Sequence, residues 1–272
     1  MLKSVLAAIP TYTMTYFQLP NSLHKRIQSA LTRFWWDANS EKKKMSWISW
    51  RKMTKSFKMG GLGFRDIKTF NSALLAKLSW RILQNPSCLL ARVFTGKYCQ
   101  NRSFLDCFVP SSASYGWRSI CVGRDLLKPH IGKIIGTGET TSVWTAPWLS
   151  LSTPLAPMGP PTADSQDLTV EELRDPITLE WNKLLIRRLL PAYEKAILKL
   201  RPSFKGAADT WAWLPTSTGE YSVKWGYFEA LQETPLEDDP TYPHPPSDFS
   251  WKANIWSTKS SPKSKMLLWK AA

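Results

Sequence analysis

Few residues in this chain have the types and the spacing that catalysis or metal binding requires. Its four cysteines are separated by 11, 8 and 14 residues, so no CxxC pair is present to begin a zinc site or a redox motif. They are Cys88, Cys99, Cys107 and Cys121. The three histidines are scattered, without neighbours at metal-ligand spacing. We therefore predict buried free thiols of an intracellular protein, and no metal or other cofactor.

The residues best suited to bind another molecule are basic and lie in the first third of the chain. Residues 1–100 hold 17 Lys and Arg against Asp37, Glu41 and Asp66, whereas residues 101–272 hold 19 against 18 acidic residues. Such asymmetry is expected of a segment that lies against a polyanion, so RNA or DNA is the expected partner and an anionic membrane surface is second. The predicted nucleic-acid-binding residues are Lys25, Arg26, Arg33, Lys42, Lys43, Lys44, Arg51, Lys52, Lys55 and Lys58.

Two of the 15 tryptophans, Trp47 and Trp50, lie inside this basic segment. They could stack on an unpaired base while the basic side chains neutralise phosphates. The alternative is a core that buries both rings under a solvated basic face, and we favour it for the tryptophans. Glycines at 60, 61 and 63 predict a turn rather than a phosphate-binding loop, because the Lys-Ser/Thr of a P-loop is lacking.

The elements that position these residues are mainly helical. Apolar residues at steps of three to four predict helical pieces over 2–19 broken at Pro10, a helix capped by Asn21, and a helix from Asp66 to Asn85. The apolar face of the second helix is predicted to comprise Leu23, Ile27, Leu31, Phe34 and Trp35. Further helices are predicted at 87–98, 115–127, after Val170, through 225–231 and on either side of Pro262.

Two β-hairpins are predicted at 131–149, around a Gly-Thr-Gly-Glu turn, and at 211–223. The fold class is therefore mainly α with small β-hairpins (α+β). The predicted organisation is a basic helical region with a terminal hairpin over 1–149, a Pro/Ser-rich linker over 150–168, and a smaller α+β region over 169–272. No stretch has the apolar length of a membrane span, and no secretory signal is evident.

Several sequence segments resemble segments of the C-terminal region of plant LINE-type non-LTR retrotransposon reverse transcriptases, and they occur in the same order. They are LKSVLAAIPTYTMTYFQLP (2–20), FWWD (34–37), GGLGFRD (60–66), FNSALLAKLSWRI (70–82), KYC (97–99), SYGWRSI (114–120), GRDLL (123–127), IGTGETTSVWTAPWL (135–149), WAWLPTSTGEYSVKWGY (211–227) and FSWKANIWSTKSSPKSKMLLWKA (249–271). The resemblance spans essentially the whole chain. It implies that the first region is similar to a thumb and that 169–272 is the beginning of the reverse transcriptase zinc-binding region.

The family is an RNA-directed DNA polymerase, whose chemistry needs paired palm aspartates holding two metal ions. The only Asp-Asp pair here, Asp238-Asp239, lies in a Pro-rich segment, and the Cys/Cys/His/Cys zinc ligands are not found. The resemblance thus implies a fragment of a transposable element that binds nucleic acid without being an enzyme. Ala146 stands where the family has an aspartate. The alternatives are a protein-interaction or scaffold module and a non-functional transposon relic.

Overall fold

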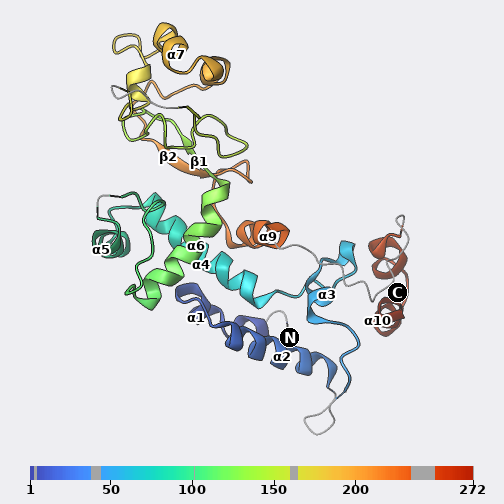
Figure 1. The fold of residues 1–272 in the computed structure, drawn as a ribbon. Helices are drawn as coiled ribbons and strands as arrows, with labels where there is room; N and C mark the ends of the chain where they lie inside the picture. Colours follow the sequence, from blue (N-terminus) through green and yellow to red (C-terminus); the bar gives the residue numbers. More distant parts are fainter. Residues whose placement is uncertain (3–4, 38–43, 101, 160–164, 234–248, 272) are drawn as a thin grey trace. The chain divides into compact units, whose positions relative to one another are not determined.

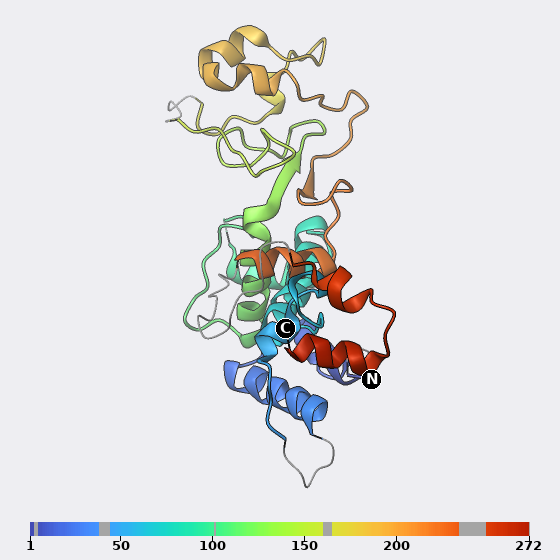
Figure 2. The ribbon, with the colours of Figure 1, turned by 90° about the vertical axis from the view of Figure 1, so that its right-hand side faces the viewer.

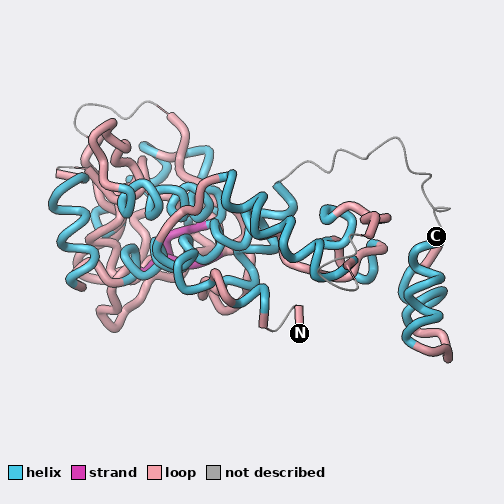
Figure 3. The backbone as a smooth tube through the Cα atoms, turned by 90° about the horizontal axis from the view of Figure 1, so that it is seen from below, coloured by secondary structure: helices cyan, strands magenta, loops and turns pink. Residues whose placement is uncertain are grey.

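The computed structural model confirms the predicted fold class, because helices dominate and the described residues contain one two-stranded sheet (Figure 3). The chain forms two compact units, unit 1 (Met1–Leu75 and Tyr227–Ala272) and unit 2 (Ala76–Gly226). The described residues are 1–2, 5–37, 44–100, 102–159, 165–233 and 249–271.

Unit 1 combines the start and the end of the chain. Its elements are η1 (Leu6–Ala8), α1 (Thr11–Tyr16), α2 (Asn21–Trp36), α3 (Trp50–Thr54), η2 (Phe57–Met59), the first half of α4 (Ile67–Gln84), the second half of α9 (Val223–Glu233), the π-helical turn η6 (Lys252–Trp256) and α10 (Pro262–Ala271) (Figure 1). The break at Pro10 is confirmed, since η1 and α1 are separate helical pieces. The predicted cap of α2 is wrong: Pro20, with extended backbone, is the N-cap, and Asn21 is the first helical residue.

The segment 249–271 packs on residues 50–60 through aromatic rings. Phe57 and Trp256 meet edge to face with centroids 5.0 Å apart, and Trp269 Nε1 donates a 2.7 Å hydrogen bond to the carbonyl of Gly60. Gly60 has a φ of +77°, and a Cβ built there would lie 2.5 Å from a ring carbon of Trp251. As predicted for a turn, this glycine supplies a left-handed backbone, and it also lets the indole approach closely.

Replacing Gly60 with alanine is expected to destabilise unit 1 by about 1–3 kcal/mol, because the new methyl group would both strain the backbone and displace the Trp251 ring. Urea unfolding followed by tryptophan fluorescence measures the change. The matched control is Gly96→Ala in the helix α5 (Leu89–Tyr98), where no atom lies within 4 Å of the added Cβ and a helical alanine is favoured. Equal stability of the Gly60 variant and wild type would contradict the close approach.

Unit 2 contains the sheet and the central helices. Its elements are the second half of α4, α5 (Leu89–Tyr98), α6 (Tyr115–Leu127), η3 (Lys128–His130), β1 (Ile131–Ile134), η4 (Glu171–Leu173), α7 (Lys183–Leu189), η5 (Pro191–Tyr193), α8 (Glu194–Ile197), β2 (Thr210–Trp213) and the first turn of α9. The helices predicted at 87–98 and 115–127 are confirmed as α5 and α6. The predicted linker 150–168 lies within this unit, with 160–164 outside the described residues, and the division into family domains stays a prediction.

The two predicted hairpins are wrong in their pairing, because each contributes one strand to a common sheet. β1 leaves η3 at the end of α6 and pairs antiparallel with β2, with Ile131 opposite Trp213 and Ile134 opposite Thr210 (Figures 1 and 2). The Gly-Thr-Gly-Glu segment therefore does not turn β1 back on itself. It closes around a carboxylate 73 residues beyond Gly136.

That carboxylate belongs to Asp209, next to the first residue of β2. Its Oδ1 accepts from the backbone N–H groups of Gly136 and Gly138, both at 2.8 Å. Its Oδ2 accepts from the hydroxyls of Thr141 at 2.6 Å and Thr140 at 3.0 Å, and from the Thr140 N–H at 3.1 Å. Burial alone would raise the pKa of Asp209, but these hydrogen bonds together outweigh burial and lower its pKa. The ionised side chain thus joins the loop after β1 to the start of β2.

Asp209→Asn is expected to lower the free energy of unfolding of unit 2 by about 2–3 kcal/mol, since the amide keeps the size but loses the charge that five donors approach. Because the pKa of Asp209 is lower in the folded state, its contribution is complete above the ordinary aspartate pKa of about 4 and is lost as the pH falls through the folded-state pKa. Urea unfolding at a series of pH values should show the two proteins converging in acid. The control is Asp167→Asn, at an exposed carboxylate of the same unit. If the difference in unfolding free energy between wild type and Asp209→Asn does not shrink in acid, the role of the ionised Asp209 is contradicted.

Candidate nucleic-acid interface

The predicted basic residues are carried by four consecutive parts of unit 1. Lys25, Arg26 and Arg33 are exposed on α2; Lys44 is exposed before α3; Arg51 and Lys52 are in α3; Lys55 and Lys58 follow it. Lys42 and Lys43 lie outside the described residues. The structure thus brings eight of the ten into one unit, on neighbouring elements.

On α2, Arg26 and Arg33 lie opposite the buried residues His24 and Leu31. Arg26 and Arg33 are seven residues apart, which places them about 20° from each other and roughly 10 Å apart along the helix. His24 and Leu31, each two residues earlier, are buried about 200° around the helix. The predicted apolar face is therefore correct at Leu31 but wrong at Phe34, which is 49% exposed. His24 and Trp36 are buried instead, because a polar partner in α4 accommodates the imidazole.

That partner, Asn71, fixes α2 in place. Asn71 is 1% exposed, and its Nδ2 donates to the carbonyls of Met14 at 2.7 Å and Phe17 at 2.9 Å. Its Oδ1 accepts from the N–H of Leu19 at 2.8 Å and lies 3.2 Å from His24 Nε2. Burial lowers the pKa of His24, although the bond to Asn71 acts in the opposite direction, so the neutral imidazole is favoured. One amide therefore joins α1, the following turn and α2 to α4.

Arg33 and Lys44 come together at the C-terminal end of α2. They line an open hollow of about 310 Å³ with the polar side chains of Gln28, Ser29, Thr32, Asp37 and Ser46. Asp37 Oδ1 accepts from the backbone N–H of Lys44 at 2.9 Å, which holds the two chain segments together. The lining is polar and carries two cations against one carboxylate. It can offer charge-assisted hydrogen bonds to a phosphate group.

Trp47 and Trp50 have opposite environments. Trp50 is 5% exposed and stacks on Phe64, with ring centroids 5.4 Å apart and planes at 17°, so the prediction of a core role is confirmed for this ring. Trp47 is 66% exposed, and the same prediction is wrong for it. The Ser49 cap of α3 explains the difference, because it starts the helix at Trp50 and leaves Trp47 in the extended segment before it. An exposed indole between Lys44 and Arg51 offers a face on which a base can stack.

Lys52 is the least suited of the eight to contact a phosphate. It is half-buried, with its Nζ 5.5 Å from the centre of the Trp251 ring. Burial lowers the pKa of Lys52, and the charge of Lys55 lowers it further. Its ammonium group therefore serves the packing of 249–271 on α3.

Two basic groups were missed from sequence. The first lies in the C-terminal part of unit 1, where Lys252, Lys259, Lys263 and Lys270 are exposed; Lys270 Nζ is 4.8 Å from the ring of Trp36. The second lies in unit 2, where residues 183–205 hold seven Lys and Arg against Glu194, a net of +6. A local charge count would have found the second group, which the average over 101–272 concealed. The first depends on packing between distant segments.

The described residues contain no group of three or more His, Cys, Asp or Glu side chains placed to hold a metal ion. Asp238-Asp239 falls outside them. Within the described part of the chain, no helix has both the length and the apolar character needed to cross a bilayer.

Two proteins of Arabidopsis thaliana are similar to this chain. Over 152 residues it is 45% identical to an uncharacterized mitochondrial protein, covering 56% of this chain and 99% of that protein. Over 283 aligned positions it is 29% identical to a protein named "putative ribonuclease H protein", covering 98% of this chain but 43% of that protein. No protein-family model matches the chain, and no solved structure does.

Proposed function

Because the chain belongs to the same family as the uncharacterized mitochondrial protein of Arabidopsis, with which it shares 45% identity, we propose that both derive from a plant retrotransposon reverse transcriptase. The ordered phrases described above support this origin. So does the similarity along nearly the whole chain to the protein named "putative ribonuclease H protein". The chain spans less than half of that longer protein.

The role we propose for the chain is binding of RNA or DNA, with RNA–DNA hybrid as the substrate class, through unit 1. The observation that carries this proposal is the combination of exposed cations on α2, α3 and the segment between them with the exposed ring of Trp47. Cations contribute affinity through phosphates, and an aromatic face contributes through unpaired bases. We propose no catalytic step for these residues.

A protein-interaction module is the second candidate, and one observation favours it. Phe34, Met45 and Trp47 are all exposed apolar side chains in this region. A protein partner would cover them by burying apolar area, a contribution that depends little on salt. Nucleic-acid binding through the neighbouring cations depends steeply on salt. The two candidates therefore differ in a measurable property.

Trp47→Ala tests the stacking part of the proposal. It is expected to weaken binding to an RNA–DNA hybrid with a single-stranded overhang about 5- to 150-fold, from about 1–3 kcal/mol per stacked base. Binding to the blunt hybrid should change little, because a duplex offers no unpaired base. Fluorescence anisotropy with a labelled strand measures both. Trp47→Phe should retain most of the affinity, and Trp225→Ala, at an exposed ring in unit 2, is the control. Equal affinity of wild type and Trp47→Ala for the overhang substrate would refute stacking by Trp47.

A further inference from the structure

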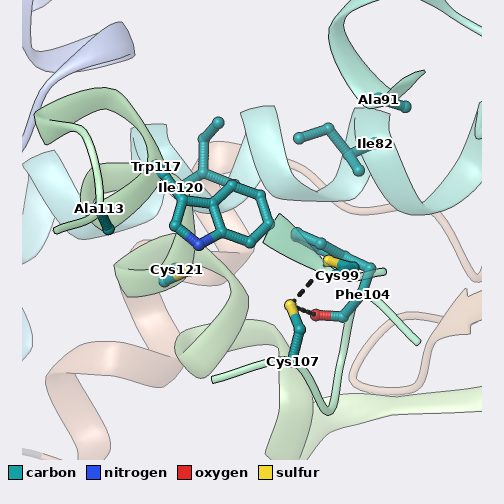
Figure 4. Packing of buried hydrophobic residues seen from close by; sticks show 9 residues of the cluster. All are labelled: Ile82, Ala91, Cys99, Phe104, Cys107, Ala113, Trp117, Ile120 and Cys121. Atoms are coloured by element: carbon teal, nitrogen blue, oxygen red, sulfur yellow. Dashed lines mark hydrogen bonds between the residues drawn. The ribbon is translucent and has the colours of Figure 1, made fainter. Parts of the chain in front are cut away.

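Three of the four cysteines meet in one buried cluster of unit 2. The cluster surrounds Trp117, which is fully buried and stacks on Tyr98 with ring centroids 4.9 Å apart. Its buried members are Ile82, Ala91, Cys99, Phe104, Cys107, Ala113, Trp117, Ile120 and Cys121 (Figure 4). The predicted burial of free thiols is thus confirmed for Cys99, Cys107 and Cys121, while Cys88 is only half-buried.

Two of these thiols are in direct contact. The Sγ atoms of Cys99 and Cys107 are 2.9 Å apart, with Cys99 as the donor (Figure 4). Cys107 Sγ also lies 3.3 Å from the carbonyl oxygen of Phe104. Cys121 has no such contact with either sulfur among the described residues, although it belongs to the same cluster. Of the three pairs that Cys99, Cys107 and Cys121 could form, Cys99 and Cys107 are therefore the pair in contact.

The surroundings of the pair are asymmetric. Arg124, buried on α6, donates from Nη1 to the carbonyl oxygen of Cys107 and lies 3.5 Å from Cys107 Sγ. Cys107 thus has a cation and a donating thiol as neighbours, which is the setting in which a cysteine sulfur attacks a disulfide. Burial, and after it the hydrogen bond to Cys107, together raise the pKa of Cys99 to about 12. Cys99 is held as the protonated partner.

We propose that Cys99 and Cys107 are a disulfide-forming pair, oxidised by thiol–disulfide exchange with a low-molecular-weight disulfide. Cys107 Sγ attacks one sulfur of the small disulfide, whose S–S bond breaks and releases one thiol. Cys99 then loses its proton and attacks Cys107 Sγ, which forms the Cys99–Cys107 bond and releases the second thiol. Two protein thiols are oxidised and one small disulfide is reduced to two thiols, so electrons and protons balance.

Access sets the rate of this exchange. Both sulfurs are buried, so the small disulfide reaches Cys107 only when the packing around the pair opens locally. Next to Cys107, Asp106 Oδ1 lies 3.1 Å from Lys128 Nζ, and both side chains of this ion pair are exposed. The new bond would close a loop of nine residues and constrain the unfolded chain, so it should raise the unfolding temperature of unit 2.

The test is incubation of the full chain with oxidised glutathione, followed by alkylation, trypsin digestion and mass spectrometry. Cleavage after Arg102 separates the two sulfurs, so the bond would join peptides 98–102 and 103–118. We expect this linked pair as the main product, with a mass lower by two hydrogens than that of the separate peptides. Cys121→Ser and Cys88→Ser should give the same product, and Cys99→Ser should give glutathione attached to Cys107.

Other products would overturn the proposal. One is glutathione retained on Cys107 of the wild-type protein, and another is a disulfide that includes Cys121. A third is unmodified Cys99 and Cys107 under conditions in which the urea-unfolded chain reacts. Because the decisive measurement is made on wild-type protein, a variant that fails to fold does not affect the result. We expect both results together: the linked peptide pair and a raised unfolding temperature of unit 2.

Discussion

Reversing three charges, Arg26→Glu, Arg33→Glu and Lys44→Glu together, is expected to weaken binding of an RNA–DNA hybrid on the order of a hundredfold or more at about 0.1 M salt. These residues are exposed, two lie on one face of α2, and Arg33 and Lys44 line the same hollow. Each lost phosphate contact removes a counterion-release contribution worth several-fold in affinity. Fluorescence anisotropy of a labelled hybrid measures the loss, and circular dichroism checks that the helices remain.

The control separates position from overall charge. Lys183→Glu, Arg188→Glu and Lys195→Glu change the net charge of the chain by the same amount, in the basic segment of unit 2. If unit 1 carries the interface, this variant should retain affinity within a few-fold of wild type. An equal or greater loss of affinity in the control variant would indicate that unit 2 carries the interface and would contradict the proposal.

Asn71→Ala is expected to have the largest effect on stability, lowering the free energy of unfolding of unit 1 by about 3–4 kcal/mol. The side chain is buried and its two polar atoms engage α1, the turn at Leu19 and α2. Removal takes buried hydrogen bonds from the carbonyl of Met14 and the N–H of Leu19, and each buried polar group that loses its partner costs about 1–3 kcal/mol before relaxation. Urea unfolding followed by circular dichroism measures the change.

Ser72→Ala is the matched control for Asn71→Ala. Ser72 is the next residue of α4 and is half-buried, and its Oγ makes only a 3.4 Å contact with the carbonyl of Lys68. The control should stay within about 0.5 kcal/mol of wild type. Since α2 carries Arg26 and Arg33, Asn71→Ala should also weaken hybrid binding. A stable, fully binding Asn71→Ala protein would show that α2 does not depend on this amide.

The helices of this chain could be predicted because their signals are local. Asp66 caps α4 by accepting from the N–H of Thr69 at 2.8 Å, the apolar spacing continues for 18 residues, and Asn85-Pro86 ends it. The sheet could not be predicted, because its strands are more than 70 residues apart in sequence. The glycines at 136 and 138 predict the turn of a hairpin, but in the structure their N–H groups bind the carboxylate of Asp209.

The candidate site was predictable in its charges and not in its aromatic residues. Lys25, Arg26 and Arg33 could be placed on the outside of α2 because charged side chains are rarely buried unpaired. Trp47 and Trp50 each follow a serine, and the segment is too short to show a period. Only the contact of Trp50 with Phe64, 14 residues away, separates the buried ring from the exposed one.

The salt dependence of wild-type binding is the most direct test of nucleic-acid binding by unit 1. A labelled RNA–DNA hybrid is titrated with the full chain at several salt concentrations between about 50 and 200 mM, and the logarithm of affinity is plotted against that of salt. Contacts from the exposed cations of α2, α3 and Lys44 predict a slope of about −3 or steeper, at about −0.9 per phosphate. A slope near zero, or no binding at the lowest salt, would contradict nucleic-acid binding by this chain.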